Sequence, residues 1–324
     1  MSLTRRQLGL RLGLLVLLAA GGGLLRMLVG GGGLVWPESG AIFDLRFHRL
    51  LTGSAVGAGL AIAGVLLQSL LRNPLAAPDL MGLSAGAGLA VTLWALLTGG
   101  AIGVAGSAAP ALVGAMAVLG FVWVLSQRRG LVDPVTMILV GVILSVLLGS
   151  ATALVRTQLP DQGQSAARWM MGAISDDAPR GAVAGVWLVT LAIGGVSLWM
   201  GRLFDAASLG EDEARSSGVP IGWVRAVQLI GAGVLTAGTI VLAGPVGFVG
   251  LVCPHAARLL LGPGHRVLVV GSALAGIALV VGADALIKAA PGPAGRVPVG
   301  VVTSLVGGPV FLAMLLRSRR DGAG

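Results

Sequence analysis

Residues whose types and spacing could carry chemistry are sparse in this chain, because only 11% of its 324 residues are charged. Asp284 and Lys288 lie four residues apart in a long apolar run, where a helix would place them on one face as an ion pair. We expect this pair to be structural. Proton- or sodium-coupled transport normally needs carboxylates near the bilayer midplane, or a visible inverted repeat of broken helices, and the sequence shows neither of these clearly.

His255 is a second candidate for chemistry, and it lies two residues after Cys253. A zinc or haem site needs several His, Cys or carboxylate ligands to converge, and only Cys253 is near in sequence. We therefore expect a packing role or a structural hydrogen bond for His255 and a buried side chain for Cys253. The sequence predicts neither a metal site nor a cofactor bound by this chain.

ATP hydrolysis through a P-loop is excluded by the basic residues. Lys288 is the single lysine among 22 basic residues, and Ala289 follows it where the G-x-x-x-x-G-K-[ST] pattern requires serine or threonine. The chain has no candidate catalytic residues. We expect ATP and magnesium to be used by a separate partner subunit.

Membrane-spanning helices must position these residues. Hydrophobic residues make up 56% of the chain and the mean hydropathy is +0.94, which is typical of an all-α integral membrane protein. The 54 glycines fit close packing of helices within lipid. At about 20 residues per span, the chain accommodates about ten spans. Apolar runs place them near 8–29, 50–71, 80–98, 102–126, 131–155, 181–201, 222–243, 246–261, 267–288 and 298–316.

The arginines predict the orientation. More of them fall on segments that are internal if both termini are cytoplasmic, as the positive-inside rule requires. The net charge of +9 comes without a basic stripe of the kind that binds nucleic acid. We predict a multi-pass protein of the bacterial cytoplasmic (inner) membrane, with no nucleic-acid partner.

One polar segment, 205–220, is unusual for such a chain. Ser208 and Glu211 have the spacing of a capping box and Gly218 is placed as a helix stop, so a short helix over about 209–217 is predicted. A helix of this length is not stable alone in water and must pack on something. Three consecutive carboxylates argue against an anionic membrane surface and favour a cytoplasmic protein partner.

Four ordered motifs resemble those of the FecCD family, the permease subunits of ABC importers for iron–siderophores, haem and cobalamin. They are Arg72-Asn-Pro-Leu-Ala76 with the following Pro78–Gly86, then Leu209–Val219, Gly244–Arg258 and Val297–Phe311. Together they extend over nearly the whole chain, which we interpret as a single permease domain, 1–324. The motif residues that we single out are Arg72, Asn73, Pro74, Gly244, Pro245, Gly247, Phe248, Gly250, Pro254 and His255.

The resemblance implies a ten-helix subunit of the type II ABC importer permease architecture. Two permeases, most simply a homodimer, would surround a central path, with two ATPase subunits on the cytoplasmic side and a substrate-binding protein outside. Segment 205–220 would couple the permease to the ATPase subunit. Its candidate contacts are Leu209, Gly210, Glu211, Asp212, Ala214, Arg215 and Gly218.

On the outer side, the run Leu45–Arg49 resembles a family motif whose two arginines receive carboxylates of the binding protein. Arg46 and Arg49 match these arginines, although His48 replaces a proline between them. Arg296 resembles a third docking arginine. Guanidinium groups suit bidentate recognition of carboxylates. Anchoring to lipid headgroups is the alternative for all three.

These patterns predict the permease subunit of an ATP-driven importer that moves a metal chelate, an iron–siderophore complex first, by alternating access. Import of haem or cobalamin is the alternative within the family. An ion-coupled secondary transporter is the alternative of another class. The sequence does not identify the cargo or the helix faces that line the path.

Overall fold

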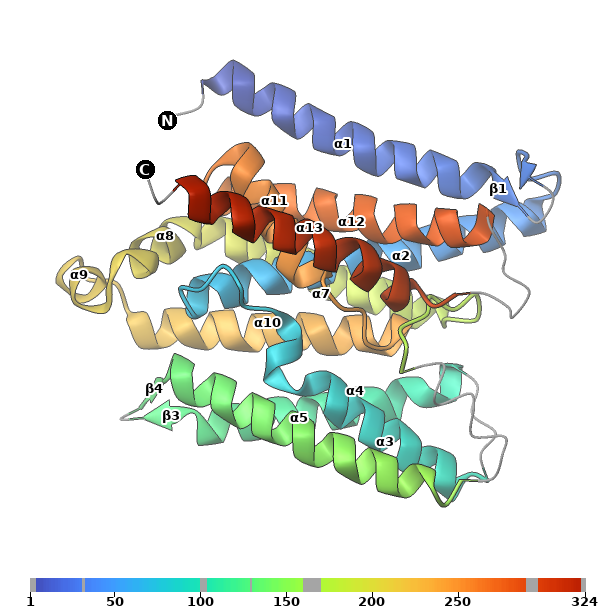
Figure 1. Ribbon diagram of the computed structural model, residues 1–324, viewed down its shortest axis with the longest axis horizontal. Helices are drawn as coiled ribbons and strands as arrows, with labels where there is room; N and C mark the ends of the chain where they lie inside the picture. The colour runs from blue at the N-terminus through green and yellow to red at the C-terminus, as the bar shows by residue number, and fades with distance from the viewer. Residues whose placement is uncertain are drawn as a thin grey trace.

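The computed structural model describes residues 4–30, 33–99, 104–128, 130–159, 170–289 and 297–321. In these ranges the chain is a bundle of helices with two short antiparallel hairpins, β1–β2 and β3–β4 (Figure 1). The elements are α1 (Arg5–Leu28), β1 (Val29–Gly30), β2 (Gly33–Leu34), α2 (Gly40–Leu70), the 3-10 helix η1 (Pro78–Met81), α3 (Leu83–Leu97), α4 (Val104–Leu125), β3 (Gln127–Arg128), β4 (Leu131–Val132), α5 (Pro134–Arg156), α7 (Arg180–Trp199), α8 (Gly201–Leu209), α9 (Glu211–Ser216), α10 (Ile221–Ala243), α11 (Val249–Leu261), α12 (His265–Ala289) and α13 (Val299–Asp321).

Seven helices in the described ranges are long and apolar enough to cross a membrane: α1, α2, α4, α5, α7, α10 and α12. Three shorter apolar helices, α3, α11 and the apolar part of α13, coincide with the expected spans 80–98, 246–261 and 298–316. Helix α11 is short because the chain is broken before it. Gly244 and Phe248 both have positive φ angles, and Pro254 lies inside the helix.

The second helix begins earlier than the sequence indicated. It starts at Gly40 rather than near residue 50, with the Ser39 hydroxyl accepting a hydrogen bond from the Ile42 amide. Polar residues in its first three turns hid this start from a hydropathy argument. Arg46 and Arg49 therefore lie on a helix and not in a loop.

Helix α2 is the centre of the bundle, and it is buried from Thr52 to Leu70. It packs most extensively against α12 and α10. The approach to α12 is close enough that a Cβ atom on either Gly57 or Gly276 would meet the carbonyl oxygen of the other. Gly64 is placed in the same way against the carbonyl oxygen of Gly250 in α11. Glycine therefore serves helix packing at these crossings, as expected.

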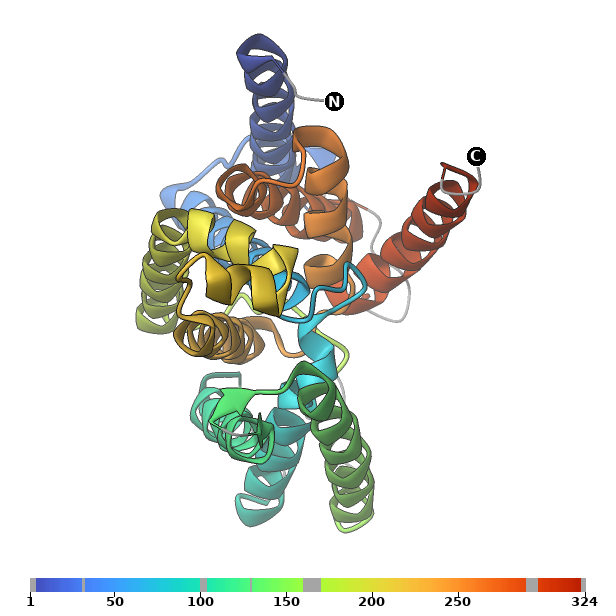
Figure 2. The same cartoon turned by 90° about the vertical axis from the view of Figure 1, so that its left-hand side faces the viewer.

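Figure 2, which looks along the bundle, shows α3, α4 and α5 as a group on one side of α10 and α13 extending away from the other helices. In Figure 1, α8, α9 and the β3–β4 hairpin lie at the end of the bundle where α1 begins and α13 ends. The β1–β2 hairpin lies at the opposite end. We call these the α9 end and the β1 end.

Candidate functional site

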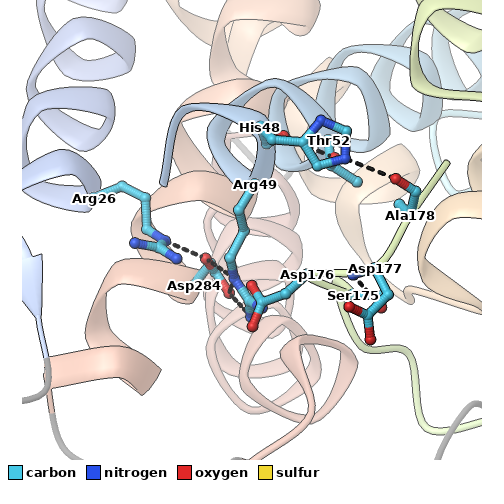
Figure 3. Close-up of polar contacts among 9 residues, drawn as sticks. All are labelled: Arg26, His48, Arg49, Thr52, Ser175, Asp176, Asp177, Ala178 and Asp284. Atoms are coloured by element: carbon cyan, nitrogen blue, oxygen red, sulfur yellow. Dashed lines mark hydrogen bonds and ion pairs between the residues drawn. The ribbon is translucent and has the colours of Figure 1, made fainter. Parts of the chain in front are cut away.

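At the β1 end, a cluster of four charged side chains joins three helices and one loop (Figure 3). The carboxylate of Asp284 on α12 accepts hydrogen bonds from Arg26 Nε at 2.6 Å and from Arg49 Nε and a terminal guanidinium nitrogen at 2.9 and 2.6 Å. Arg49 also donates to Asp176 at 2.6 Å. We call Arg26, Arg49, Asp176 and Asp284 the outer cluster.

Burial makes the charge balance of the outer cluster important. The side chains of Arg26, Arg49 and Asp284 are 3%, 6% and 2% exposed, and that of Asp176 is 27% exposed. Two cations face two anions, so each buried charge has a partner of opposite sign. Charges withdrawn from water persist in a protein only under this condition.

The outer cluster gives Asp284 partners that the sequence did not predict. We expected Lys288, one turn along the same helix, as the partner of Asp284, and that pair stays a prediction. The structure pairs Asp284 with two arginines, from α1 and α2. The sequence could have indicated Arg26 as a partner for a buried carboxylate, because it is an arginine two residues before the end of an apolar helix. No short-range pattern linked Asp176 to Arg49, because they are 127 residues apart.

The loop over 170–179 is fixed to several helices at this end. His48 contacts the Ala178 carbonyl oxygen through Nε2 at 2.8 Å, next to the bond between Arg49 and Asp176 (Figure 3). Further along the loop, the Ala173 amide donates to Ala243 O at the end of α10. The Gly172 carbonyl accepts from Gly300 N near the start of α13. This loop therefore connects α2, α10 and α13.

The three expected docking arginines are placed differently. Arg46 is half-buried, and it donates to the carbonyl oxygens of Met27 at 2.5 Å and Val35 at 2.8 Å beside the β1–β2 hairpin. Arg49 is committed to the outer cluster, so a carboxylate from another protein could reach it only by displacing Asp284 or Asp176. Arg296 lies outside the described residues.

At the α9 end, segment 205–220 forms two helices instead of one. The Ser208 hydroxyl donates to Phe204 O within α8, so it does not cap the next helix, and the expected capping box is wrong. Gly210, which has no side chain to donate or accept, precedes α9. The expected stop at Gly218 is confirmed by its positive φ of 75° and by the bond from the Val219 amide back to Ala214 O.

The candidate ATPase contacts fall into two groups. Leu209 is 76% exposed, and Asp212, Arg215 and Gly218 are also exposed, whereas Ala214 is buried and Gly210 is partly buried. The side chain of Glu211, which is 38% exposed, bonds Arg225 at 2.8 Å and Arg215 at 2.7 Å. The hydrogen bond from Arg225, reinforced by Arg215, holds the pKa of Glu211 below its usual value. Glu211 therefore fixes α9 to α10.

A polar cavity of about 450 Å³ lies between α9, α10 and the β3–β4 hairpin. Arg225 spans it, because it also donates to Val132 O at 3.2 Å. The lining residues are Arg128, Leu131, Val132, Asp133, Glu211, Arg215 and Arg225.

Helix α8 is attached to two other parts of the bundle. Oδ1 of Asp205 accepts from the backbone amide of His265 at 3.0 Å and contacts its ring Nδ1 at 2.6 Å, at the first turn of α12. Arg72, after the end of α2, donates to Ala207 O at 2.8 Å. In the same turn Asn73 Oδ1 accepts from the Leu75 amide, and Pro74 is exposed. The first motif therefore supports α8.

The motif after α10 is a packing junction. A Cβ atom at Gly250 would lie 2.6 Å from the Pro78 ring, and Phe248 packs against Gly307 of α13. The ring of His255 meets Phe311 edge-on with centroids 6.3 Å apart. Cys253 is buried. Within the described ranges no group of three or more His, Cys, Asp and Glu residues could hold a metal ion. The remaining motif residues, Gly244, Pro245, Gly247 and Pro254, form the break and the first turns of α11.

The sequence matches the model of the FecCD transport family over residues 24–317. It is 36% identical over 285 residues to the cobalamin import system permease protein BtuC of Halobacterium salinarum, covering 87% of this chain and 75% of that protein. It is 32% identical to the hemin transport system permease protein HmuU of Yersinia pestis, covering 99% and 98%. It is 33% identical to the ferric enterobactin transport system permease protein FepD of Escherichia coli, covering 87% and 84%.

The structure is similar to a solved inward-facing conformation of a metal-chelate type ABC transporter. The TM-score is 0.84 and the sequence identity 26%, over 95% of this chain and 99% of that one.

Proposed function

The chain belongs to the FecCD transport family, and on this basis we propose that it is the permease subunit of an ATP-driven importer of a metal chelate, an iron–siderophore complex first. The family membership and the apolar helices support a multi-pass protein of the inner membrane. The proposed subunit has ten spans, and both of its termini are cytoplasmic.

The observation that carries the proposal is the combination of an exposed helix and its internal supports at one end of the bundle. Leu209 and Asp212 face outward, while Glu211 and Asp205 hold α9 and α8 against other helices. A partner that moved α9 would therefore move the bundle. We assign this partner as an ATPase subunit, one for each permease of a homodimer, with hydrolysis driving alternating access of a path between the two copies.

The coupling role is tested by charge reversal on the exposed face of α9. Asp212→Lys with Glu213→Lys leaves the internal bond of Glu211 intact, so the helix stays in place. We expect co-purification of the ATPase subunit, or uptake, to be lost. Asp177→Lys, a charge reversal on an exposed residue at the β1 end, is the control for co-purification, which it should leave unchanged. Unchanged assembly and uptake in the α9 variant would refute the assignment.

Docking of a substrate-binding protein belongs at the β1 end, and Arg46 is the arginine with which to test it. Arg49→Glu would disrupt the outer cluster and could not be interpreted. Arg46→Gln keeps an N–H donor for the carbonyl oxygens of Met27 and Val35 and removes the charge, so it should weaken association with the binding protein, and the affinity of the unmodified complex should fall with added salt. Arg156→Gln, which removes an exposed charge at the end of α5, is the control. Equal affinities for both variants would point to headgroup anchoring.

The relatives are named for cobalamin, hemin and ferric enterobactin, so the cargo needs its own experiment. The binding protein is titrated with a ferric siderophore, haem and cobalamin, and the same ligands are offered to proteoliposomes that hold the full complex. ATP-dependent uptake of the ferric siderophore alone is the expected result. Uptake of haem or cobalamin instead would change the cargo. Uptake without the ATPase subunit, driven by a proton gradient, would overturn the importer and favour a secondary transporter.

A further inference from the structure

Helix α12 is held at both of its ends by charged side chains. At the α9 end, its first residue, His265, bonds Asp205 of α8 through both its amide and its ring. The next residue, Arg266, donates to Leu198 O at the end of α7. The ring of Phe204, also on α8, meets the His265 ring edge-on. A displacement of α8 is therefore passed directly to the start of α12.

Between its ends α12 is continuous. It runs for 25 residues without a proline. Its tightest crossing is at Gly276, where its backbone touches that of Gly57 on α2. At 1.5 Å per residue, this crossing lies about 16 Å from His265 and about 12 Å from Asp284. Neither glycine places a side chain between the two backbones, so α12 can pivot on α2 at this crossing.

At the β1 end α12 holds the outer cluster through Asp284. Arg49 joins that carboxylate to Asp176 in the 170–179 loop, and the same loop is bonded to the end of α10 and the start of α13. A tilt of α12 by about 5° would move the His265 end by ~1.4 Å and Asp284 by ~1 Å. A shift of ~1 Å is enough to take a 2.6 Å bond between Arg49 and Asp284 out of hydrogen-bonding range.

We propose that α12 is a transmembrane lever, and that Asp205, Asp284 and Arg49 are its positioning residues. Movement of α8 and α9 tilts α12 about the crossing of Gly276 and Gly57, and the outer cluster transmits the tilt to the 170–179 loop. In this mechanism Arg49 links the helix that carries Arg46 to the loop, and it is not itself a docking residue. The proposal rests on the proposed function, since it requires a partner that moves α9.

The test uses the complete complex of permease, ATPase subunits and cargo-loaded binding protein in proteoliposomes. The measured quantity is the stimulation of ATP hydrolysis by the loaded binding protein. Asp205 is 46% exposed, so Asp205→Asn should fold. We expect Asp205→Asn and Asp176→Asn to keep the ATPase subunit bound, with stimulation reduced by at least about fivefold, the low end of coupling between distant sites. Asp205→Glu should restore part of the stimulation, and Asp177→Asn, next to Asp176, should leave it unchanged.

A second measurement follows the loop itself. The exposed Ala173 is replaced by cysteine, and its rate of modification by a water-soluble maleimide is compared with and without trapped ATP; Cys253 is buried and does not compete. The lever predicts an ATP-dependent change that Asp205→Asn abolishes. The same change in both backgrounds, or full stimulation in Asp205→Asn and Asp176→Asn, would overturn the lever and leave the importer intact. An unmodified complex that shows no stimulation would overturn the proposed function, and the lever with it.

Discussion

The outer cluster makes a quantitative prediction about stability. Asp284→Asn removes one negative charge from a site where the arginine side chains are 3% and 6% exposed, and among the described residues it leaves the partly exposed Asp176 as the carboxylate that faces Arg26 and Arg49. Breaking a buried pair in this way costs about 3–5 kcal/mol. At about 1.4 kcal/mol for each factor of ten, the folded-to-unfolded ratio should fall by roughly two to nearly four orders of magnitude.

The double variant Arg26→Met with Asp284→Asn tests the physical reason. It removes one charge of each sign and leaves Arg49 paired with Asp176, so the cluster is again neutral. We therefore expect it to be more stable than Asp284→Asn alone, with a coupling of roughly 1–3 kcal/mol between the two sites. The reason is that a buried charge without a partner costs more stability than the loss of the whole pair.

The assay is equilibrium unfolding of the purified chain in detergent, followed by circular dichroism as the fraction of denaturing detergent rises. Asp177→Asn is the matched control and should stay within about 0.5 kcal/mol of the unmodified chain. A loss below about 1 kcal/mol in Asp284→Asn would mean that water reaches the cluster. Strictly additive losses in the double variant would refute the argument from charge balance.

Three further predictions concern other parts of the bundle. Because Arg225 holds the pKa of Glu211 below its usual 4.5, their bond stabilises α9 fully at neutral pH and loses this contribution as the pH falls below about 4.5. Hydrogen exchange of α9 should accelerate there, and Arg225→Met should reduce that acid dependence to the part that Arg215 supplies. Gly64→Ala would drive a methyl group into the carbonyl oxygen of Gly250 and should cost about 1–3 kcal/mol or prevent folding, measured by the same unfolding assay. Asp133→Ala removes the cap from the Thr136 amide at the start of α5 and should cost about 1 kcal/mol, whereas asparagine at the same position should be tolerated.

The structure has a helix at each span that hydropathy predicted, because the length of an apolar run is a local property of the sequence. Hydropathy failed at the start of α2, where Asp44, Arg46, His48 and Arg49 interrupt the apolar run although the backbone is helical from Gly40. Polar residues are tolerated there because they pair with the loop and with other helices. Local spacing failed in the same way at Ser208, whose hydroxyl has a nearer acceptor in the previous turn of α8.

The sequence identified residues of the candidate sites, but it did not predict which other residues they would bond. Glu211 was identified from its place in a polar segment. Its bond to Arg225, which is 14 residues away and on the next helix, was not predicted. Arg49 was assigned to docking because the run Leu45–Arg49 resembles a family motif whose arginines receive carboxylates of the binding protein. Its actual partners are separated from it by 127 and 235 residues, and only the packing of α2 against α12 brings them together.

These separations have a consequence for the order in which the protein is made. Arg26 and Arg49 are synthesised 258 and 235 residues before Asp284, so α1 and α2 enter the bilayer before the carboxylate that neutralises them exists. Until then, Arg26 must extend to the headgroup region, because an unpaired charge is costly within lipid, and Arg49 must do so or rely on Asp176, which is made 127 residues after it. Insertion of α12 draws both inward. Burial of the two arginines is therefore a late step of biogenesis, completed only by a chain that has been translated through α12.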